Sequence, residues 1–301
     1  MTKNVVEIRD LSRQFGGNYA LKGISFRAAE GLIYGLVGVN GAGKTTLIKH
    51  CLGLLRALTG SVEIFGLDPV RNPVEVLGRI GYLSEDRDMP EWMTVKELLD
   101  YSRAYHPRWD EQYARQLLIS FNLDQNKKIK ELSKGMRAQV GLVAAVAHRP
   151  DLLILDEPSS GLDAVVREDI LDAIVRTISD EGRTVIFSSH LLEEVERMSD
   201  HITMIHQGEI TLDDSLDTIR ESWQISTVRY PDNLIDAPQV DGALAVEGSG
   251  RSWNVIHPNS LDQLKTALAV QDGELVQSRQ ATLQEIFIAR VGRDRYKTEA
   301  A

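Results

Sequence analysis

The sequence predicts an α/β fold, on the strength of two segments. An apolar run at Leu32–Val37 leads through a glycine-rich loop into a helix that starts near Lys44, which is a strand, loop and helix in succession. A second run, Leu152–Leu155, is apolar throughout, which is typical of a strand buried on both faces of a parallel sheet. The composition changes towards the C-terminal end, so residues 1–215 are expected to form the main domain and residues 216–301 a small α+β appendage.

The glycine-rich loop, Gly38-Val39-Asn40-Gly41-Ala42-Gly43-Lys44-Thr45, fits the phosphate-binding (P-loop) pattern GxxxxGK[ST]. Its glycines let successive main-chain N–H groups point inward, and the helix start adds partial positive charge. We expect Lys44 to supply a point charge and the Thr45 hydroxyl to bind Mg²⁺, which prefers hard oxygen ligands. The residues expected to bind the nucleotide here are Gly38, Asn40, Gly41, Ala42, Gly43, Lys44, Thr45 and Thr46. A glycine turn that binds nothing is the alternative, and the flanking strand and helix count against it.

Two carboxylates, Asp156 and Glu157, end the second apolar run. At the carboxyl edge of an open α/β sheet they would face the crevice where ligands bind, whereas unpaired carboxylates beside an apolar core are costly. We expect Asp156 to bind Mg²⁺ and Glu157 to orient or deprotonate the attacking water in catalysis. Phosphoanhydride hydrolysis needs mainly positioning and charge stabilisation. The alternative, a helix cap, is less favoured beside a phosphate loop.

A third motif, Leu132-Ser133-Lys134-Gly135-Met136, stands between these segments and leads into a helix predicted over Met136 to about His148. With it, Val5–Gly208 resembles the ATP-binding cassette family, the ATPase subunits of ABC transporters. In that family this signature segment closes over the ATP held by another subunit. The resemblance therefore implies that Ser133 and Gly135 contact the γ-phosphate of ATP in trans. Taken alone, Ser133 is more simply the N-cap of the helix.

The resemblance also assigns roles to two residues away from these motifs. Asp163, in Ser160-Gly161-Leu162-Asp163, matches the loop that couples the two ATP sites across the dimer. Phe15 lies where the family has an aromatic side chain stacked on adenine, and Tyr19 is the alternative. A core position is the other interpretation of an aromatic residue so near the start of the chain.

His190 follows a strand predicted over Thr184–Phe187 and precedes a predicted helix. It resembles the family's switch histidine, which would donate a hydrogen bond to the γ-phosphate and help hold Glu157 and the water. A lone histidine is usually a packed or surface residue. The position of Ser188-Ser189-His190 at a strand end favours the catalytic role.

The chain departs from the family pattern at Glu85, where a glutamine is usual, after Ile80-Gly81-Tyr82-Leu83-Ser84. A carboxylate there can ligate Mg²⁺, but it adds negative charge near the triphosphate, and a pair of unit charges at 4 Å is worth roughly 4 kcal/mol at a surface-like dielectric. We expect Glu85 to lie on the metal in the catalytic site or to pair with a cation such as Arg87. The signature also departs, with Lys134 for the usual first glycine and Met136 for the usual glutamine.

Several further elements are expected on either side of the phosphate loop. Val5–Phe26 is predicted to form short strands around a Gly16-Gly17-Asn18 turn, in an N-terminal antiparallel β layer, and Ser61–Phe65 and Arg79–Leu83 are predicted strands. A helical subdomain that carries the signature is expected over about residues 86–150.

Within this subdomain, Thr94-Val95-Lys96-Glu97 forms a capping box ahead of a helix that ends at His106-Pro107. In the family this subdomain meets the coupling helix of the transmembrane partner, so Glu85–Trp109 is the expected docking surface. Three apolar residues fit that surface and the subdomain core equally well: Met89, Trp92 and Met93.

The C-terminal appendage shows no catalytic cluster, and a role in dimerisation or regulation is a hypothesis. Its predicted elements are strands at Gln224–Tyr230 and Ala243–Ile256 with a Gly248-Ser249-Gly250 turn, a helix at Leu261–Val270, and a last helix that is capped by Thr282-Leu283-Gln284-Glu285 and ends at Arg290. A frayed tail is expected from Arg293 onward.

The composition narrows the class of protein. The 301 residues carry a formal net charge of −10, which disfavours a nucleic-acid surface, and the basic cluster Lys127-Lys128-Ile129-Lys130 is more simply a solvated loop. Cys51 is the sole cysteine, so no intrachain disulfide is expected. We therefore expect the protein to work in a reducing cytosol. No segment approaches the ~18–20 apolar residues that span a bilayer, and residues 1–10 lack the apolar core of a signal peptide.

The expected function is that of the ATP-hydrolysing subunit of an ABC transporter, peripheral on the cytoplasmic face of the membrane, with ATP and Mg²⁺ as cofactors. It would power translocation, with export favoured, through separate transmembrane permease subunits. Its partner in ATP-driven dimerisation would be a second ATP-binding subunit, a copy or a paralogue. The alternative is a non-transport cassette acting on ribosomes or DNA, but no nucleic-acid partner is expected. A P-loop kinase or GTPase would leave the signature and His190 unexplained.

Overall fold

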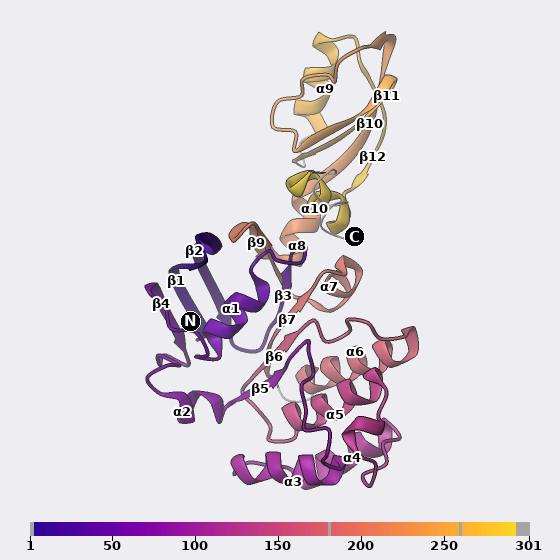
Figure 1. Cartoon of the computed structure of the whole chain (residues 1–301). Coiled ribbons are helices and arrows are strands. Elements are labelled where there is room, and N and C mark those ends of the chain that lie inside the picture. Colours follow the sequence, from indigo (N-terminus) through magenta and orange to yellow (C-terminus); the bar gives the residue numbers. More distant parts are fainter. Residues whose placement is uncertain (1–2, 180–181, 259–260, 293–301) are drawn as a thin grey trace. The chain divides into compact units, whose positions relative to one another are not determined.

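The computed structural model forms two compact units, Met1–Leu212 and Asp213–Ala301 (Figure 1). The domain boundary predicted from the sequence lies after residue 215. Three stretches of the chain are described, residues 3–179, 182–258 and 261–292. The tail predicted from Arg293 onward lies outside them.

A six-stranded sheet in the order β5-β6-β7-β3-β8-β9 forms the centre of the first unit (Figure 1). Its strands are β3 (Ile33–Val37), β5 (Ile80–Leu83), β6 (Leu152–Asp156), β7 (Thr184–Ser189), β8 (His201–His206) and β9 (Glu209–Ser215). The pairings from β5 across to β8 are all parallel. Every residue of β3, β6 and β7 is buried, as in a parallel sheet covered on both faces, so the predicted α/β core is confirmed.

An antiparallel layer in the order β2-β1-β4 accompanies this sheet. Its strands are β1 (Asn4–Phe15), β2 (Asn18–Ala29) and β4 (Thr59–Ile64). The layer and the turn at Gly16-Gly17 agree with the prediction, but the short strands expected over Val5–Phe26 are instead two strands of 12 residues. Several register shifts interrupt their pairing. Such bulges break the simple alternation of buried and exposed residues, which is why the sequence suggests shorter pieces.

The helices described in the α/β core are α1 (Lys44–Cys51), α2 (Pro73–Leu77), α6 (Ala164–Ser179) and α7 (Leu192–Met198). Helix α1 begins at Lys44, as predicted, and contacts β2, β4 and β6, while α7 contacts β3 and β7. Cys51 lies inside the fold, and burial raises the pKa of its thiol to about 12. A buried thiol that holds its proton this firmly is a packing residue.

The helical subdomain comprises α3 (Val95–Tyr105), α4 (Glu111–Ser120), a 3₁₀ turn (Ile129–Glu131) and α5 (Lys134–Val146). The capping box is present: Glu97 N–H donates to Thr94 Oγ1, and Thr94 N–H donates to the Glu97 carboxylate. Helix α5 begins two residues before the predicted start at Met136 because Ser133 caps it. It ends at Val146 rather than near His148. Helix α4 was not predicted.

The sequence did not decide whether Met89, Trp92 and Met93 belong to the docking surface or to the core of the subdomain. Of these three residues only Trp92 is exposed, with 69% of its area accessible. Met93 is half-buried, and so is Met89, which lies against Gly141 of α5. The lysines of the basic cluster are exposed while Ile129 is buried, which fits the predicted solvated loop.

The described part of the C-terminal unit contains a three-stranded antiparallel sheet and three helices. Its elements are β10 (Trp223–Leu234), β11 (Ala245–Pro258), β12 (Glu274–Gln280), α8 (Leu216–Ser222), α9 (Leu261–Val270) and α10 (Leu283–Val291). Within β11 the chain doubles back near Gly250, where φ is +62°, and Leu244 N–H donates to the Ile256 carbonyl at 2.7 Å. This reversal lies at the predicted glycine turn. Helix α9 has the predicted bounds and α10 has the predicted capping box, whereas α8 and β12 were not predicted.

No helix in the described stretches is both long enough and apolar enough to cross a membrane.

Candidate active site

The loop between β3 and α1 turns tightly because two glycines lie against main chain. Gly43 has φ +117°, and any Cβ there would run into the Ala20 carbonyl. A Cβ at Gly38 would meet the carbonyl of Ile205. Gly43 is also the N-cap of α1, and no side chain caps the helix, so the first-turn N–H groups are available to an anion.

A cavity of about 320 Å³ opens at this loop. Its lining residues are Asn40, Gly41, Ala42, Gly43, Lys44, Thr45, Thr46, Glu85 and Glu157. Seven of them belong to the predicted phosphate-binding segment and two are predicted acidic site residues. The charged lining therefore consists of one lysine and two glutamates.

Lys44 and Glu157 meet inside this cavity. The Lys44 Nζ lies 3.1 Å from Glu157 Oε1, and both side chains are buried. The ammonium also donates to the Gly38 carbonyl at 2.5 Å. Each charge depends on the other, because a desolvated charge without a partner is strongly destabilising.

A serine hydroxyl fixes both acidic residues at the end of β6. Ser188 Oγ accepts the main-chain N–H of Glu157 at 2.9 Å and donates to Asp156 Oδ1 at 2.6 Å. Glu157 has φ +47°, a left-handed conformation that costs a non-glycine residue about 1–3 kcal/mol and is concentrated at functional sites. This function of Ser188 was not predicted, because in the sequence Ser188 stands out only as a neighbour of His190.

His190 contacts the other carboxylate oxygen of Glu157. Its Nδ1 lies 2.8 Å from Oε2, so Glu157 stands between Lys44 and His190. A neutral imidazole that donates from Nδ1 has Nε2 as an acceptor, and only the protonated ring donates from both nitrogens. The structure thus joins three predicted site residues in one chain of contacts.

Glu85 lines the same cavity, close to other carboxylates. Burial and then the charges of Glu157, Asp156 and Asp86 raise the pKa of its carboxyl. The ion pair with Arg87, one of the two alternatives for Glu85, is not found among the described residues. The Arg87 guanidinium instead donates to two main-chain carbonyls of the segment after Glu157.

The donor set at this edge of the sheet fits Mg²⁺ held jointly with a phosphate. In the part of the chain that the structure describes, no cluster of three or more His, Cys, Asp or Glu is arranged to hold a metal unaided. Mg²⁺ usually takes only one or two carboxylates and completes its shell with water and phosphate oxygens. Thr45 and Glu85 line the cavity and Asp156 ends the adjoining strand, and the crowding of carboxylates around Glu85 favours a cation.

The predicted aromatic site residues lie outside the cavity lining. Phe15 ends β1 with 48% of its area exposed, and the Arg13 guanidinium lies 4.7 Å from its ring centre. Tyr19, the alternative, is 53% exposed on β2. Both rings are accessible rather than part of the core.

Three further predicted site residues have local structural roles outside the lining. Ser133 Oγ accepts the N–H of Met136 at the start of α5. Asp163 Oδ1 accepts the N–H of Val166 and of the preceding residue at the start of α6. Gly135 lies against Val166, where a Cβ would be only 2.9 Å from a methyl group. The structure therefore does not bring Ser133, Gly135 and Asp163 to the phosphate loop of their own chain.

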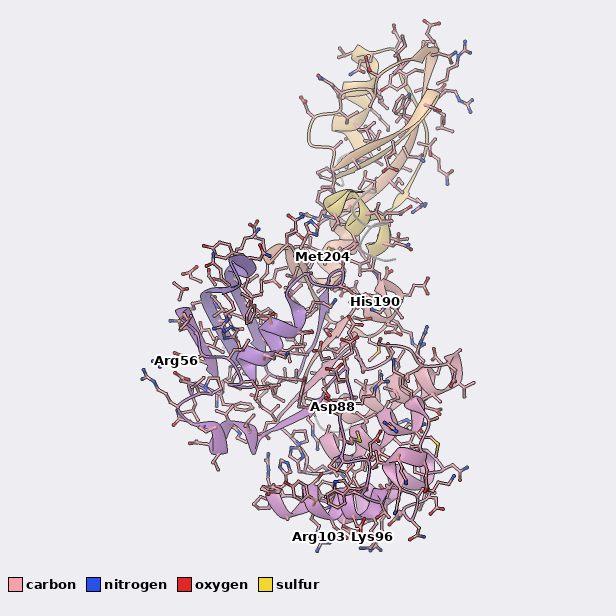
Figure 2. The ribbon with its side chains drawn as sticks, in the orientation of Figure 1. Arg56, Asp88, Lys96, Arg103, His190 and Met204 are labelled. Carbon is pink, nitrogen blue, oxygen red and sulfur yellow. The ribbon has the colours of Figure 1, made fainter. Side chains whose placement is uncertain are left out.

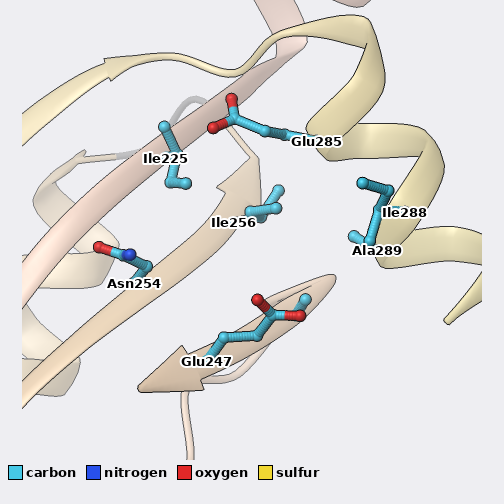
Figure 3. A pocket seen from close by; sticks show the side chains of 8 residues that line it. Ile225, Glu247, Asn254, Ile256, Glu285, Ile288 and Ala289 are labelled. Carbon is cyan, nitrogen blue, oxygen red and sulfur yellow. The ribbon is translucent and has the colours of Figure 1, made fainter. Parts of the chain in front are cut away.

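A separate cavity of about 130 Å³ lies within the C-terminal unit (Figure 3). Its lining residues are Ile225, Ala245, Glu247, Asn254, Ile256, Glu285, Ile288 and Ala289. Glu285 is already paired with Arg279 at 2.6 Å and closes the capping box of α10. The cavity is smaller than the roughly 300 Å³ at which ligand pockets usually begin, and we assign it no ligand.

Comparison with known proteins gives consistent matches. Residues 21–160 match the ABC transporter domain family. The ABC transporter ATP-binding protein YtrB of Bacillus subtilis (strain 168) is 30% identical over 96% of this chain and 98% of that protein. The daunorubicin resistance ATP-binding protein DrrA3 of Streptomyces coeruleorubidus is 29% identical over 100% of both chains. A solved ATP-binding subunit of an ABC transporter superposes with a TM-score of 0.66 at 29% identity, covering 72% of this chain and 92% of that one.

Proposed function

This chain belongs to the ATP-binding proteins of ABC transporters and is an ATPase of that family, and we propose that it powers export through separate membrane subunits. The name of DrrA3 refers to drug resistance, and DrrA3 aligns with this chain over its full length, C-terminal unit included. That likeness favours export over import. The protein would act at the cytoplasmic face of the membrane through its partners.

The contacts from Lys44 through Glu157 to His190 carry the proposal for hydrolysis. The loop N–H groups and Lys44 would bind the β- and γ-phosphates of ATP. Glu157 would orient the attacking water and accept its proton, and His190 would hold Glu157 in place. Because phosphoryl transfer depends mainly on positioning and charge stabilisation, this fixed carboxylate is the feature that the reaction needs.

Three residues would hold Mg²⁺ beside the phosphates: Thr45, Asp156 and Glu85. When bound, the cation neutralises charge on the phosphate oxygens. Ser188 would keep Asp156 oriented through its 2.6 Å hydrogen bond. Phe15, accessible at the end of its hairpin, would stack on adenine, with Tyr19 as the alternative.

A second ATP-binding subunit, a copy or a paralogue, would complete the site. Ser133 and Gly135 begin α5, a helix of 13 residues whose N-terminal end favours an anion, yet they lie outside the cavity of their own chain. We propose that they contact the γ-phosphate held by the partner and that Asp163 couples the two sites. ATP binding would then close the dimer and hydrolysis would reopen it.

The helical subdomain offers a surface for the membrane subunit. A cavity of about 400 Å³ opens between α3 and α4, within reach of Lys96 and Arg103, which Figure 2 labels. Its lining residues are Lys96, Leu99, Asp100, Arg103, Trp109, Glu111, Ala114, Arg115, Leu118 and Gln125. The lining combines a few apolar side chains, such as Leu99 and Leu118, with charges of both signs. Such a lining fits a short protein segment that carries both apolar and polar side chains. We propose that a cytoplasmic element of the permease docks here.

The alternative, a cassette acting on ribosomes or DNA, is not favoured. The relatives above are named as transporter or resistance ATP-binding proteins. The net charge of −10 also opposes binding to phosphate backbones.

Affinity purification of the tagged Glu157→Gln variant from detergent-solubilised native membranes with Mg-ATP tests the proposal. We expect mass spectrometry to identify a polytopic membrane protein in stoichiometric amount. The matched control is the variant Lys96→Glu/Arg103→Glu, which should still bind ATP but lose that protein. Recovery of ribosomes or nucleic acid alone would overturn the transporter function.

A further inference from the structure

The three residues after Glu157 form a turn that two buried charged side chains hold from other parts of the chain. The turn is Pro158–Ser160, and its last N–H donates to the Glu157 carbonyl at 3.1 Å. Arg87 contacts it from the loop that follows β5, and Glu194 contacts it from α7. Any shift of this turn would displace the main chain of Glu157.

Arg87 binds the main chain of the turn. Its side chain is buried, and Nη2 donates to the carbonyls of Pro158 at 3.0 Å and Ser160 at 3.1 Å. Its own N–H donates to Ser84 Oγ, which fixes the loop two residues from Glu85. Nε and Nη1 are buried without a hydrogen-bond partner among the described residues.

Glu194 binds the turn by a side-chain contact and links it to the end of β7. Its Oε2 accepts Ser159 Oγ at 2.6 Å and Ser189 Oγ at 3.2 Å. The second of these serines directly precedes His190. Oε1 lies 3.5 Å from the Arg167 Nε of α6, so one buried carboxylate joins three elements.

Fold stability alone does not account for this arrangement. Burying a guanidinium or a carboxylate is costly, and an apolar side chain of similar size often serves stability as well or better. Arg87 recovers little of the cost, because only one of its three nitrogens finds partners in the described structure. Catalysis requires a reacting group to be placed accurately, because a displacement of about 1 Å can lower a rate by about 100-fold.

We propose that Arg87 and Glu194 are positioning residues for ATP hydrolysis, which fix the turn Pro158–Ser160 and thereby the carboxylate of Glu157. Arg87 ties the turn to the Glu85 loop, and Glu194 ties it to the residue before His190. The inference rests on the proposed role of Glu157 as the group that orients water.

Steady-state ATPase measurements on the purified full chain test the inference, with each variant assayed well below its own Tm. We expect Arg87→Met to lower kcat by about 10- to 100-fold while KM for ATP stays within about 3-fold. Arg87→Lys should recover part of kcat, because its ammonium can still donate to one carbonyl. Ser159→Ala removes the shortest contact of Glu194 without stranding a charge, and it should lower kcat in the same way.

Arg79→Met is the matched control. Arg79 pairs with Asp151 at 2.6 Å and stacks on Phe65. It directly precedes β5, so it lies at the amino end of this strand, whereas Arg87 follows the carboxyl end. Its loss should lower Tm and leave kcat unchanged.

Wild-type kcat in both folded variants, Arg87→Met and Ser159→Ala, would overturn the inference. If Arg87→Met does not fold, Ser159→Ala decides alone. Glu157→Gln in the same assay distinguishes the role of Glu157 from the positioning role of Arg87 and Glu194. Activity retained in Glu157→Gln would refute the role of Glu157 itself, whereas activity lost there but kept in the other variants would refute only the inference.

Discussion

Lys44 and Glu157 form a buried ion pair, with Nζ 3.1 Å from Oε1 and at most 5% of either side chain exposed. The pair joins the residue expected to bind phosphate to the residue expected to direct water. A triphosphate in the cavity would compete with Glu157 for the lysine. Nucleotide binding and the freedom of the carboxylate are therefore coupled through one contact.

Replacing Lys44 with alanine should abolish most ATP binding. A hydrogen bond to a charged group is worth about 1.5–3 kcal/mol, so we expect the Kd for ATP to rise by at least about 10-fold. The thermal midpoint should also fall, because the buried carboxylate of Glu157 would lose its lysine partner. Isothermal titration with ATP measures the affinity, and thermal unfolding measures the midpoint. Lys49→Ala, on the exposed side of the same helix, is the control for both. ATP affinity equal in the two variants would contradict the prediction.

Glu157→Gln should keep ATP bound and accumulate a closed dimer. The amide retains the size of the side chain but cannot take a proton from water, so hydrolysis would stop before the dimer reopens. Light scattering after size-exclusion chromatography with Mg-ATP measures the mass. The double variant Lys44→Ala/Glu157→Gln should stay monomeric. A single variant that binds ATP yet remains a monomer would count against ATP-driven dimerisation of the isolated chain.

Motifs that depend on neighbours in sequence were predicted closely. The phosphate loop between β3 and α1 and the capping boxes at Thr94 and Thr282 follow from short patterns with fixed spacing. Helix α9 was predicted at its observed bounds for the same reason. By contrast, β12 is mostly exposed, so it lacks the alternation that marks a strand.

Contacts between distant segments could not be predicted in the same way. Ser188 joins Asp156 and Glu157 because β6 and β7 are neighbours in the sheet. The order of strands in a sheet cannot be predicted from local sequence patterns. A pair between Arg87 and its near neighbour Glu85 was one of the two alternatives that the sequence offered for Glu85. Arg87 instead binds carbonyls more than 70 residues away, at a turn that only the folded chain brings close.

Glu85→Gln should leave ATPase activity largely intact. The amide oxygen can still ligate Mg²⁺. Removal of the charge also relieves the two effects that raise the pKa of Glu85, which are burial and then repulsion from Glu157 and Asp156. We expect kcat within about 3-fold of the wild type at saturating Mg²⁺, a change of less than about 1 kcal/mol in the barrier. A coupled ATPase assay across a range of Mg²⁺ concentrations measures kcat. Complete loss of activity would show that the carboxylate itself is required.

Ser133→Asp separates helix capping from phosphate contact in trans. Aspartate is as good an N-cap as serine and its charge suits the start of α5, so the thermal midpoint should be kept or raised. Facing a phosphate, the same charge would be repelled, and ATP-driven dimerisation should be lost in the Glu157→Gln background. Thr282→Asp at the cap of α10 is the control. An unchanged dimer fraction would mean that Ser133 only caps its helix.

His148 should make the stability of the first unit depend on pH. The ring is buried, stacks on His106 at 3.8 Å between centres and contacts the Ile80 carbonyl through Nε2, and burial followed by the charge of His106 lowers its pKa from 6.5 to about 4. The unfolded chain therefore takes up the proton first as pH falls from 6.5 to about 4, and the free energy of unfolding drops by up to about 1.4 kcal/mol per pH unit in that window. Well above pH 6.5 the ring is neutral in both the folded and the unfolded chain, so it does not make the free energy of unfolding depend on pH. Urea unfolding of the wild type and His148→Gln across this range should give curves that converge as pH falls, whereas parallel curves would show that His148 does not titrate on unfolding.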